Sequence, residues 1–86
     1  MNIHKTHRTH TDGQSAVQVA GGNVGDCLQD LTARFPGMDA ALFTAPGKLR
    51  NQIEIYLNME STYPEELRKP VQAGDEIHII VMLAGG

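Results

Sequence analysis

The chain has 86 residues, which is enough for one small hydrophobic core and excludes a two-domain enzyme. Hydrophobic residues make up 41% and charged residues 20%, a composition typical of a folded globular domain rather than a disordered or membrane-embedded chain. The net charge of -3 offers no cationic field for phosphates, so we expect no binding to nucleic acid.

The single cysteine, Cys27, can form neither an internal disulfide nor a zinc or iron-sulfur cage by itself. The N-terminal residues lack the apolar segment of a secretion signal, and the longest apolar run, residues 79–84, is too short to cross a bilayer. We therefore expect a cytoplasmic protein that does not associate with membranes.

Two strands are predicted first, over residues 3–10 and 15–20. The turn between them contains Gly13, which can adopt a positive φ without strain. In the second segment Val17 and Val19 alternate with other residues, as expected for a strand with one buried face.

A helix is predicted to begin after Asn23 and to end at Pro36-Gly37. The side-chain oxygen of Asn23 can accept a free N–H of the first helical turn, and proline followed by glycine terminates a helix. One face carries apolar residues at helical spacing: Val24, Cys27, Leu28, Leu31 and Phe35. Cys27 is therefore expected to be a small core residue. Residues 39–43 are predicted to add another helical turn.

The second half is predicted to contain two further strands. Apolar and polar residues alternate over 52–58, which favours a strand. A loop is expected at 44–47, and 61–70 is expected to be a loop with one short helical turn near 64–67. The turn at Gly74-Asp75 precedes the last predicted strand, residues 76–83.

This order of elements predicts an α+β fold. Two strands, a crossover helix and further strands are also the order of the β-grasp fold typified by ubiquitin. We therefore expect one β-grasp domain over residues 1–83, with a mixed sheet of four to five strands covered on one face by one main helix. Residues 84–86 are expected to form a flexible Gly-Gly tail.

The last strand is apolar on both faces, whereas one helix can cover only one of them. The uncovered face is therefore expected to bind a partner protein. The predicted partner-binding surface consists of Tyr56, Ile80 and Met82 on this face, together with Leu83. In the alternative interpretation this strand is central and segment 59–70 shields the same side chains.

Two other patterns are not favoured as sites. His4, His7 and His10 would point to both sides of a strand, so we expect solvent-exposed residues and no metal site. The glycines of 21–25 lack the lysine and spacing of a phosphate-binding loop, so this segment is expected to be a strand-to-helix turn.

The C-terminal region combines several distinctive motifs: Val71, Gly74-Asp75-Glu76-Ile77, the hydrophobic strand and Ala84-Gly85-Gly86. Further motifs lie upstream, at Gly47-Lys48-Leu49-Arg50, residues 53–58, Val24-Gly25 and Phe35-Pro36-Gly37. Together these residues resemble the sulfur-carrier family of ubiquitin-like proteins. This family includes the small subunit of molybdopterin synthase, the thiamine-pathway carrier and carriers for cysteine synthesis. Where the family often has Gly or Asp after the asparagine at 58, this chain has Met59.

The resemblance implies a protein cosubstrate rather than an enzyme, with no catalytic residue and no bound cofactor or metal. An ATP-dependent activating enzyme of the ubiquitin-activating type would adenylate Gly86, and a sulfur donor would convert it to a thiocarboxylate. Ala84 and Gly85 would let the tail enter narrow active sites. The implied partners are this adenylating enzyme, a client synthase that accepts the sulfur, and a metalloprotease that trims or releases the tail.

Several functions stay open at this point. The sulfur could serve the biosynthesis of molybdopterin, cysteine, thiazole or another thio-metabolite. Alternatively, the chain is a ubiquitin-like modifier joined through Gly86 to lysines of target proteins, or a non-catalytic β-grasp interaction module with an inert tail.

Overall fold

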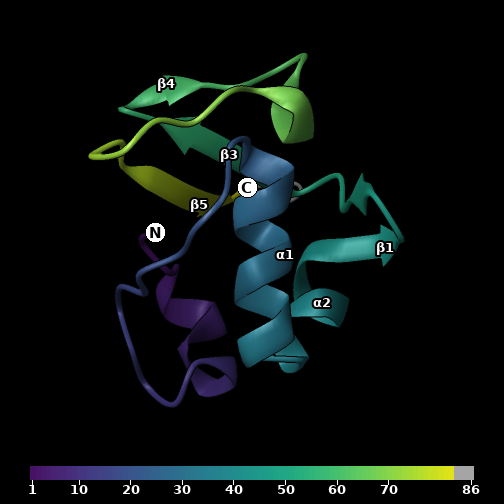
Figure 1. Ribbon diagram of the computed structural model, residues 1–86. Coiled ribbons are helices and arrows are strands. Elements are labelled where there is room, and N and C mark those ends of the chain that lie inside the picture. Colours follow the sequence, from purple (N-terminus) through teal and green to yellow (C-terminus); the bar gives the residue numbers. More distant parts are fainter. Residues whose placement is uncertain (83–86) are drawn as a thin grey trace.

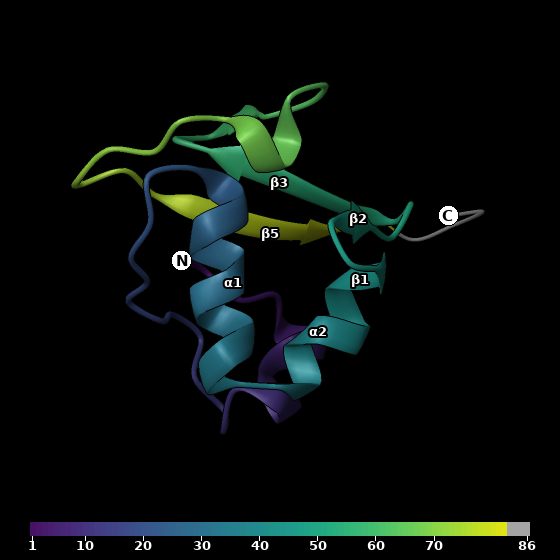
Figure 2. The ribbon, with the colours of Figure 1, turned by 45° about the vertical axis from the view of Figure 1, so that its right-hand side comes forward.

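The structure, a computed structural model, describes residues 1–82. The main helix α1 (Val24–Arg34) lies across one face of a sheet, and the shorter helix α2 (Gly37–Leu42) follows it at the far end (Figures 1 and 2). The remaining elements are η1 (Lys5–His10), β1 (Phe43–Ala45), β2 (Lys48–Leu49), β3 (Ile53–Leu57), β4 (Glu60–Ser61), η2 (Glu66–Arg68) and β5 (Ile77–Val81). Within residues 1–82 there is no helix long and apolar enough to cross a membrane.

The sheet is built around the antiparallel pair of β3 and β5, and β4 adds to the other edge of β3. On the edge of β5 that faces away from β3, Asn2 forms a parallel bridge to His78. Asn2 also forms an antiparallel bridge to Ala16, so the segment around Ala16 lies next in the sheet. These bridges extend the sheet to five chain segments of mixed direction. The predicted α+β arrangement, with a mixed sheet and one main helix, is confirmed.

The predicted strand over residues 3–10 is wrong, because residues Lys5–His10 form the 3-10 helix η1. The N-terminal segment instead joins the sheet at Asn2, before the predicted strand begins. The N–H of Asn2 donates to the carbonyl of Ile77 at 2.7 Å, and the N–H of Ile79 donates to the carbonyl of Asn2 at 3.2 Å.

The switch from extended chain to helix occurs where the apolar alternation stops. Met1 and Ile3 face the core, whereas residues 4–10 contain no aliphatic side chain. His4 then caps η1, because its Nδ1 accepts the N–H of Thr6 at 3.2 Å. A short extended segment followed by η1 therefore replaces the first predicted strand.

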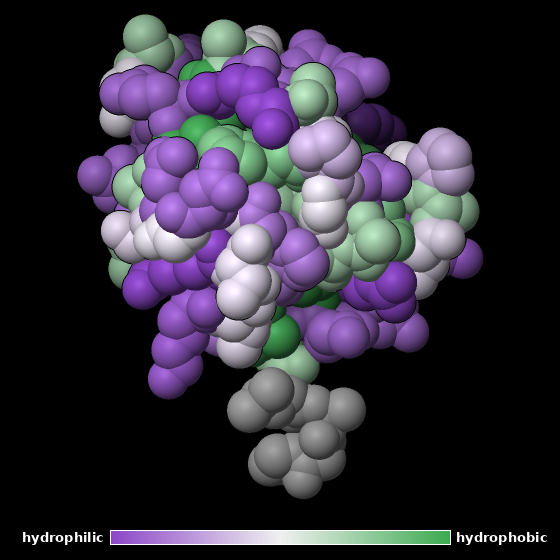
Figure 3. Space-filling model, turned by 90° about the horizontal axis from the view of Figure 1, so that it is seen from below, coloured by the Kyte–Doolittle hydropathy of each residue, from purple (hydrophilic) through white to green (hydrophobic). Residues whose placement is uncertain are grey.

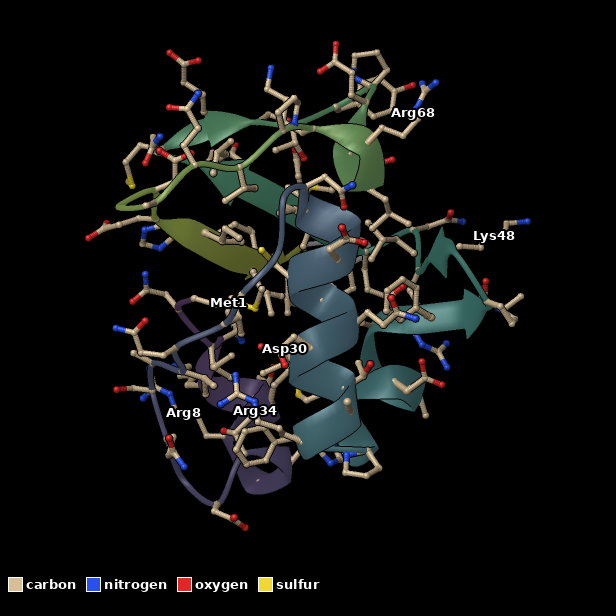
Figure 4. The ribbon with its side chains drawn as sticks, viewed as in Figure 1. Met1, Arg8, Asp30, Arg34, Lys48 and Arg68 are labelled. Carbon is tan, nitrogen blue, oxygen red and sulfur yellow. The ribbon has the colours of Figure 1, made fainter. Side chains whose placement is uncertain are left out.

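The second predicted strand, residues 15–20, is also wrong over most of its length. Pairing occurs only at its start, where Val17 donates its N–H to the carbonyl of Met1 at 2.9 Å. Beyond that point side chains of α1 hold the segment: the carboxylate of Asp30 accepts the N–H of Ala20 at 3.0 Å, and Arg34 donates to the carbonyl of Gln18. Asp30 and Arg34 lie on the side of α1 that faces this segment (Figure 4).

The predicted start of α1 is confirmed, since Oδ1 of Asn23 accepts the N–H of Asp26 at 2.7 Å. The helix ends at Arg34, just before Pro36-Gly37, as predicted. The following helix α2 begins at Gly37, two residues earlier than the predicted turn over 39–43. Asn23 and the proline-glycine pair thus set both ends of the main helix.

The core lies between α1 and the inner face of the sheet. Each fully buried aliphatic side chain stabilises the fold by about 1.5–3 kcal/mol. The buried apolar residues are Ile3, Val17, Val24, Cys27, Leu28, Leu31, Met38, Leu42, Ile53, Ile55, Ile77 and Ile79. The interpretation of Cys27 as a core residue is confirmed.

Seen from below, the surface is predominantly hydrophilic, with green confined to small areas (Figure 3).

In the second half the predicted strand over 52–58 is confirmed as β3, and the last strand is confirmed over Ile77–Val81. The predicted short helical turn lies slightly later, at η2. The expected loop at 44–47 is instead the centre of the β1–β2 hairpin, in which Gly47 has φ 74°.

The turn between β3 and β4 is tied to the turn before β5. Nδ2 of Asn58 donates to the carboxylate of Asp75 at 3.0 Å, and Oδ1 of Asn58 accepts the N–H of Glu76 at 2.9 Å. The same carboxylate accepts the N–H of Gln72 at 2.8 Å. The bond from Asn58, followed by that from Gln72, lowers the pKa of Asp75. This network sets the start of the last strand.

Gly21 allows the chain to pass closely over the first turn of α1. A Cβ there would lie 2.7 Å from the backbone nitrogen of Cys27, whereas a Cβ on the adjacent Gly22 would meet nothing within 4 Å. We expect Gly21→Ala to lower the free energy of unfolding by about 1–3 kcal/mol in urea denaturation, because backbone cannot move aside. Gly22→Ala is the control, and equal effects of the two substitutions would contradict the packing.

Asn58 and Met59 form the two-residue turn between β3 and β4, with φ values of 52° and 69°. The positive φ strains the backbone of Met59. Glycine adopts such angles without steric cost. We expect Met59→Gly to raise the free energy of unfolding by about 0.5–1 kcal/mol. Glu60→Gly, at the next exposed position, should lower it, since β4 has extended backbone. A loss of stability in Met59→Gly comparable with that control would show that the angle carries no strain.

Candidate functional site

The face of the sheet opposite α1, here called the outer face, carries both apolar and polar side chains. Paired residues of neighbouring strands share a face, and the pairs Tyr56↔His78 and Glu54↔Ile80 place these four residues together. Tyr56 and Ile80 are half-buried and lie diagonally across the two strands. The expected apolar surface is therefore interrupted by Glu54 and His78.

Met82 continues this face beyond the end of β5. Its N–H donates to the carbonyl of Gln52 at 2.7 Å, so the pairing with β3 extends by one step, and its side chain is 47% exposed. Tyr56, Ile80 and Met82 therefore occupy one face. The other predicted site residues, Leu83, Ala84, Gly85 and Gly86, lie outside the described residues. The partner-binding role of this set stays a prediction.

A groove borders the outer face at the point where β5 ends, between the β1–β2 hairpin and η2. We call it the tail-side groove and define it by six of its lining residues, Lys48, Arg50, Glu54, Tyr63, Arg68 and Met82. Its most exposed large apolar side chain is Tyr63, at 73%. Sequence analysis missed Tyr63 because it lies in a proline-containing segment without hydrophobic periodicity.

Cys27 is held in a state unsuited to nucleophilic chemistry. Its thiol is buried on the inner side of α1, with Sγ 3.8 Å from the carbonyl of Gly21. Burial, followed by the nearby carboxylates of Asp26 and Asp30, raises the pKa of the Cys27 thiol. A protonated, buried thiol is a poor nucleophile, so Cys27 is a structural residue.

The three N-terminal histidines do not form a metal centre. The rings of His4 and His7 are 6.2 Å apart at their centroids, and His10 packs over Gly37. Among residues 1–82, no group of three His, Cys, Asp or Glu side chains is placed to hold a metal ion. The expectation of exposed histidines is wrong for His7, which is only 8% exposed because it lies in η1 rather than on a strand.

The glycine-containing segment before α1 is the expected turn rather than an anion site. The N–H of Val24 donates to the carbonyl of Lys69 at 2.9 Å, and that of Asp26 is bonded to Asn23. These bonds occupy amides that a phosphate would require. A Cβ on Gly25 would lie 3.0 Å from the carbonyl oxygen of Leu67, so this glycine permits close packing of α1 on η2.

Two features define a ubiquitin-like β-grasp protein: the main helix lies across one face of the sheet, and the N-terminal segment is paired parallel to the last strand. The chain belongs to the ThiS family, whose model matches residues 5–86.

Individual relatives agree with this family. The chain is 34% identical over 82 residues to the sulfur carrier protein CysO of Mycobacterium tuberculosis, which covers 92% of this chain and 88% of the relative. A chain in the crystal structure of the Amycolatopsis orientalis BexX/CysO complex is 32% identical, with a TM-score of 0.88 over 99% of this chain and 96% of that one. SAMP1 from Haloferax volcanii is 25% identical, with a TM-score of 0.78 over 99% and 94%.

His7 should make the fold sensitive to acid. Burial, followed by repulsion from His4 and His10, lowers the pKa of His7 in the folded chain, while the unfolded chain keeps the ordinary value of 6.5. Full stability is therefore expected above pH 6.5, with progressive loss as the pH falls from 6.5 toward the lower folded-state pKa. The nitrogen Nδ1 of His7 is buried without a hydrogen-bond partner in the described part of the chain, which adds to the cost of charging the ring.

The measurement is the free energy of unfolding between about pH 7.5 and pH 5, where histidine titrates. His7→Leu should remove most of the slope. His10→Gln, at an exposed position, removes only the last-named of the three causes and should retain most of it. An unchanged slope in His7→Leu would rule out His7 as the source.

Proposed function

We propose that this chain is a sulfur carrier that bears the sulfur as a thiocarboxylate on Gly86. The observation that carries the proposal is the match to the ThiS family, which extends through residue 86 and so includes the Gly-Gly end. The 34% identity to a protein named sulfur carrier protein CysO supports the same role.

The chemistry begins with a poor electrophile. The C-terminal carboxylate attacks the α-phosphorus of ATP, pyrophosphate leaves, and an acyl-adenylate forms. A sulfur donor at the oxidation level of sulfide then attacks the carbonyl carbon, the acyl-oxygen bond breaks, and AMP departs. The thiocarboxylate on Gly86 is a nucleophile held on a protein, so it can be handed to a client enzyme without diffusing away.

The chain's own contribution is presentation rather than catalysis. The protonated thiol of Cys27 is enclosed in the core, which argues against it as the sulfur-bearing group. Tyr56, Ile80, Met82 and Leu83 are proposed to contact the partner while Ala84, Gly85 and Gly86 enter its active site. The chain is thus proposed to be a cosubstrate and not an enzyme.

Three partners are proposed: an ATP-dependent adenylating enzyme, a client synthase that accepts the sulfur, and a metalloprotease that trims or releases the tail. The structure of a relative in a BexX/CysO complex supports the idea that carriers of this kind bind other proteins. Among the uses that the family resemblance implies, the identity to CysO favours cysteine synthesis over molybdopterin or thiazole formation.

A ubiquitin-like modifier is the second candidate. It is supported by the similarity to SAMP1, a small archaeal modifier protein, at 25% identity. In this case a lysine amine of a target protein attacks the activated carbonyl of Gly86 and forms an isopeptide bond. The two functions share the activation step and differ in the nucleophile.

Intact-protein mass spectrometry of the chain purified from its host tests the leading proposal. We expect a species heavier by sulfur minus oxygen, in the unmodified chain and in Cys27→Ala alike. The species should be absent from a variant lacking Gly85 and Gly86. If the added sulfur disappears in Cys27→Ala, the carrier proposal fails. If the activated chain appears only as lysine-linked adducts, the modifier is the correct assignment.

A further inference from the structure

The tail-side groove brings together exposed apolar surface and the departure point of the C-terminal segment. The exposed large hydrophobic residues of the described chain are Met59, Tyr63 and Met82, and two of these three, Tyr63 and Met82, line this groove. Residue 82 is bonded to residue 83, so a protein that handles the C-terminal residues must come close to the groove.

The groove also contains positive charge that the described chain leaves uncompensated. Within residues 1–82, the side chains of Lys48 and Arg68 form no hydrogen bond or ion pair. They come from separate elements, β2 and η2, and both project outward on the same side of the molecule (Figure 4). Arg50 adds a third cation, which is held in place by a bond from its Nε to the carbonyl of Ala40 at 2.8 Å.

Two of the groove's carboxylates already have partners. Glu54 accepts a hydrogen bond from the hydroxyl of Ser61, and Glu65 lies 3.5 Å from the ammonium of Lys69. The hydrogen bond from Ser61 leaves Glu54 charged, so Glu54 and Glu66 together oppose the three cations of the groove. Because Glu65 is paired with Lys69, which is not a lining residue, three cations face two carboxylates. The groove therefore carries a small positive excess on a chain whose net charge is -3, which favours an acidic partner.

We propose that the tail-side groove docks a protein segment that presents carboxylates around one aromatic or large aliphatic side chain. The carboxylates pair with Lys48 and Arg68, and the apolar side chain packs between Tyr63 and Met82. Exposed tyrosine and arginine are the residue types that most often carry binding energy at interfaces. Assigning this segment to the enzyme that acts on Gly86 rests on the proposed function, whereas the docking itself does not.

The groove differs from the outer face in what it recognises. The outer face offers Tyr56 and Ile80 in a flat, half-buried setting next to Glu54 and His78. In the groove the side chains of Lys48, Tyr63 and Arg68 are exposed, and the two cations come from different elements, β2 and η2. Contact at the groove should therefore depend on salt, because exposed charges are screened at high ionic strength.

The experiment titrates the ¹⁵N-labelled full chain with the blocked peptide Glu-Asp-Leu-Phe-Asp-Glu at millimolar concentration and low salt, and follows amide shifts. We expect the shifts to concentrate on residues of the groove. Binding of the double variant Lys48→Glu/Arg68→Glu should be at least about tenfold weaker. Lys5→Glu is the matched control, since it reverses a charge in η1, and it should bind as the unmodified chain does.

A second peptide, Gln-Asn-Leu-Phe-Asn-Gln, separates charge from apolar contact. It should bind at least about tenfold more weakly than the acidic peptide, because its amides cannot form the ion pairs. Equal binding of the two peptides, shifts centred on Tyr56 and Ile80, or no shifts at all would each overturn the proposal. The peptide titration does not depend on sulfur. If the peptide binds the groove but no thiocarboxylate is found in the host, only the carrier function is refuted. If a thiocarboxylate is found but the peptide does not bind, only the docking is refuted.

Discussion

The structure depends on the pairing of β5 along both of its edges. On one edge it is antiparallel to β3 over its whole length, and on the other it is bridged by the N-terminal segment at Asn2. Its inner residues Ile77 and Ile79 are buried against the core that α1 covers. Because β5 is paired on both edges and the N–H of Met82 is bonded to the carbonyl of Gln52, the last described residue has a defined position. The proposed carrier function needs this property, since the C-terminal group has to reach partner enzymes while the rest of the chain stays folded.

The chain separates the residues that pack its core from the surfaces proposed to take part in its function. The thiol of Cys27 is enclosed in the core, and the described histidines are placed for packing or solvent rather than for a metal. In the proposed function, recognition falls to side chains at the end of β5 and beside it, on the outer face and in the tail-side groove. In this proposal the chemical steps belong to partner enzymes, and the chain contributes the surfaces that those enzymes bind.

Much of the fold could be predicted because its signals were local. Asn23 and Pro36-Gly37 marked the ends of α1, and the strict alternation of Ile53, Ile55 and Leu57 marked β3. The N-terminal half was mispredicted where long-range contacts decide the structure. Residues 3–10 carry no alternating pattern, and residues 15–20 are held partly by Asp30 and Arg34, which lie far along the chain. Tyr56, Ile80 and Met82 were found from the pattern of the strands, whereas the groove around Tyr63 exists only once η2 packs beside the β1–β2 hairpin.

The central claim is that the chain carries sulfur at its C-terminal carboxyl group. Top-down fragmentation of the protein isolated from its host tests this most directly, because it assigns the added mass to a position in the chain. The account predicts that sulfur replaces oxygen only in fragments that contain Gly86. A mass change in fragments that contain Cys27 and end before Gly86 would contradict it.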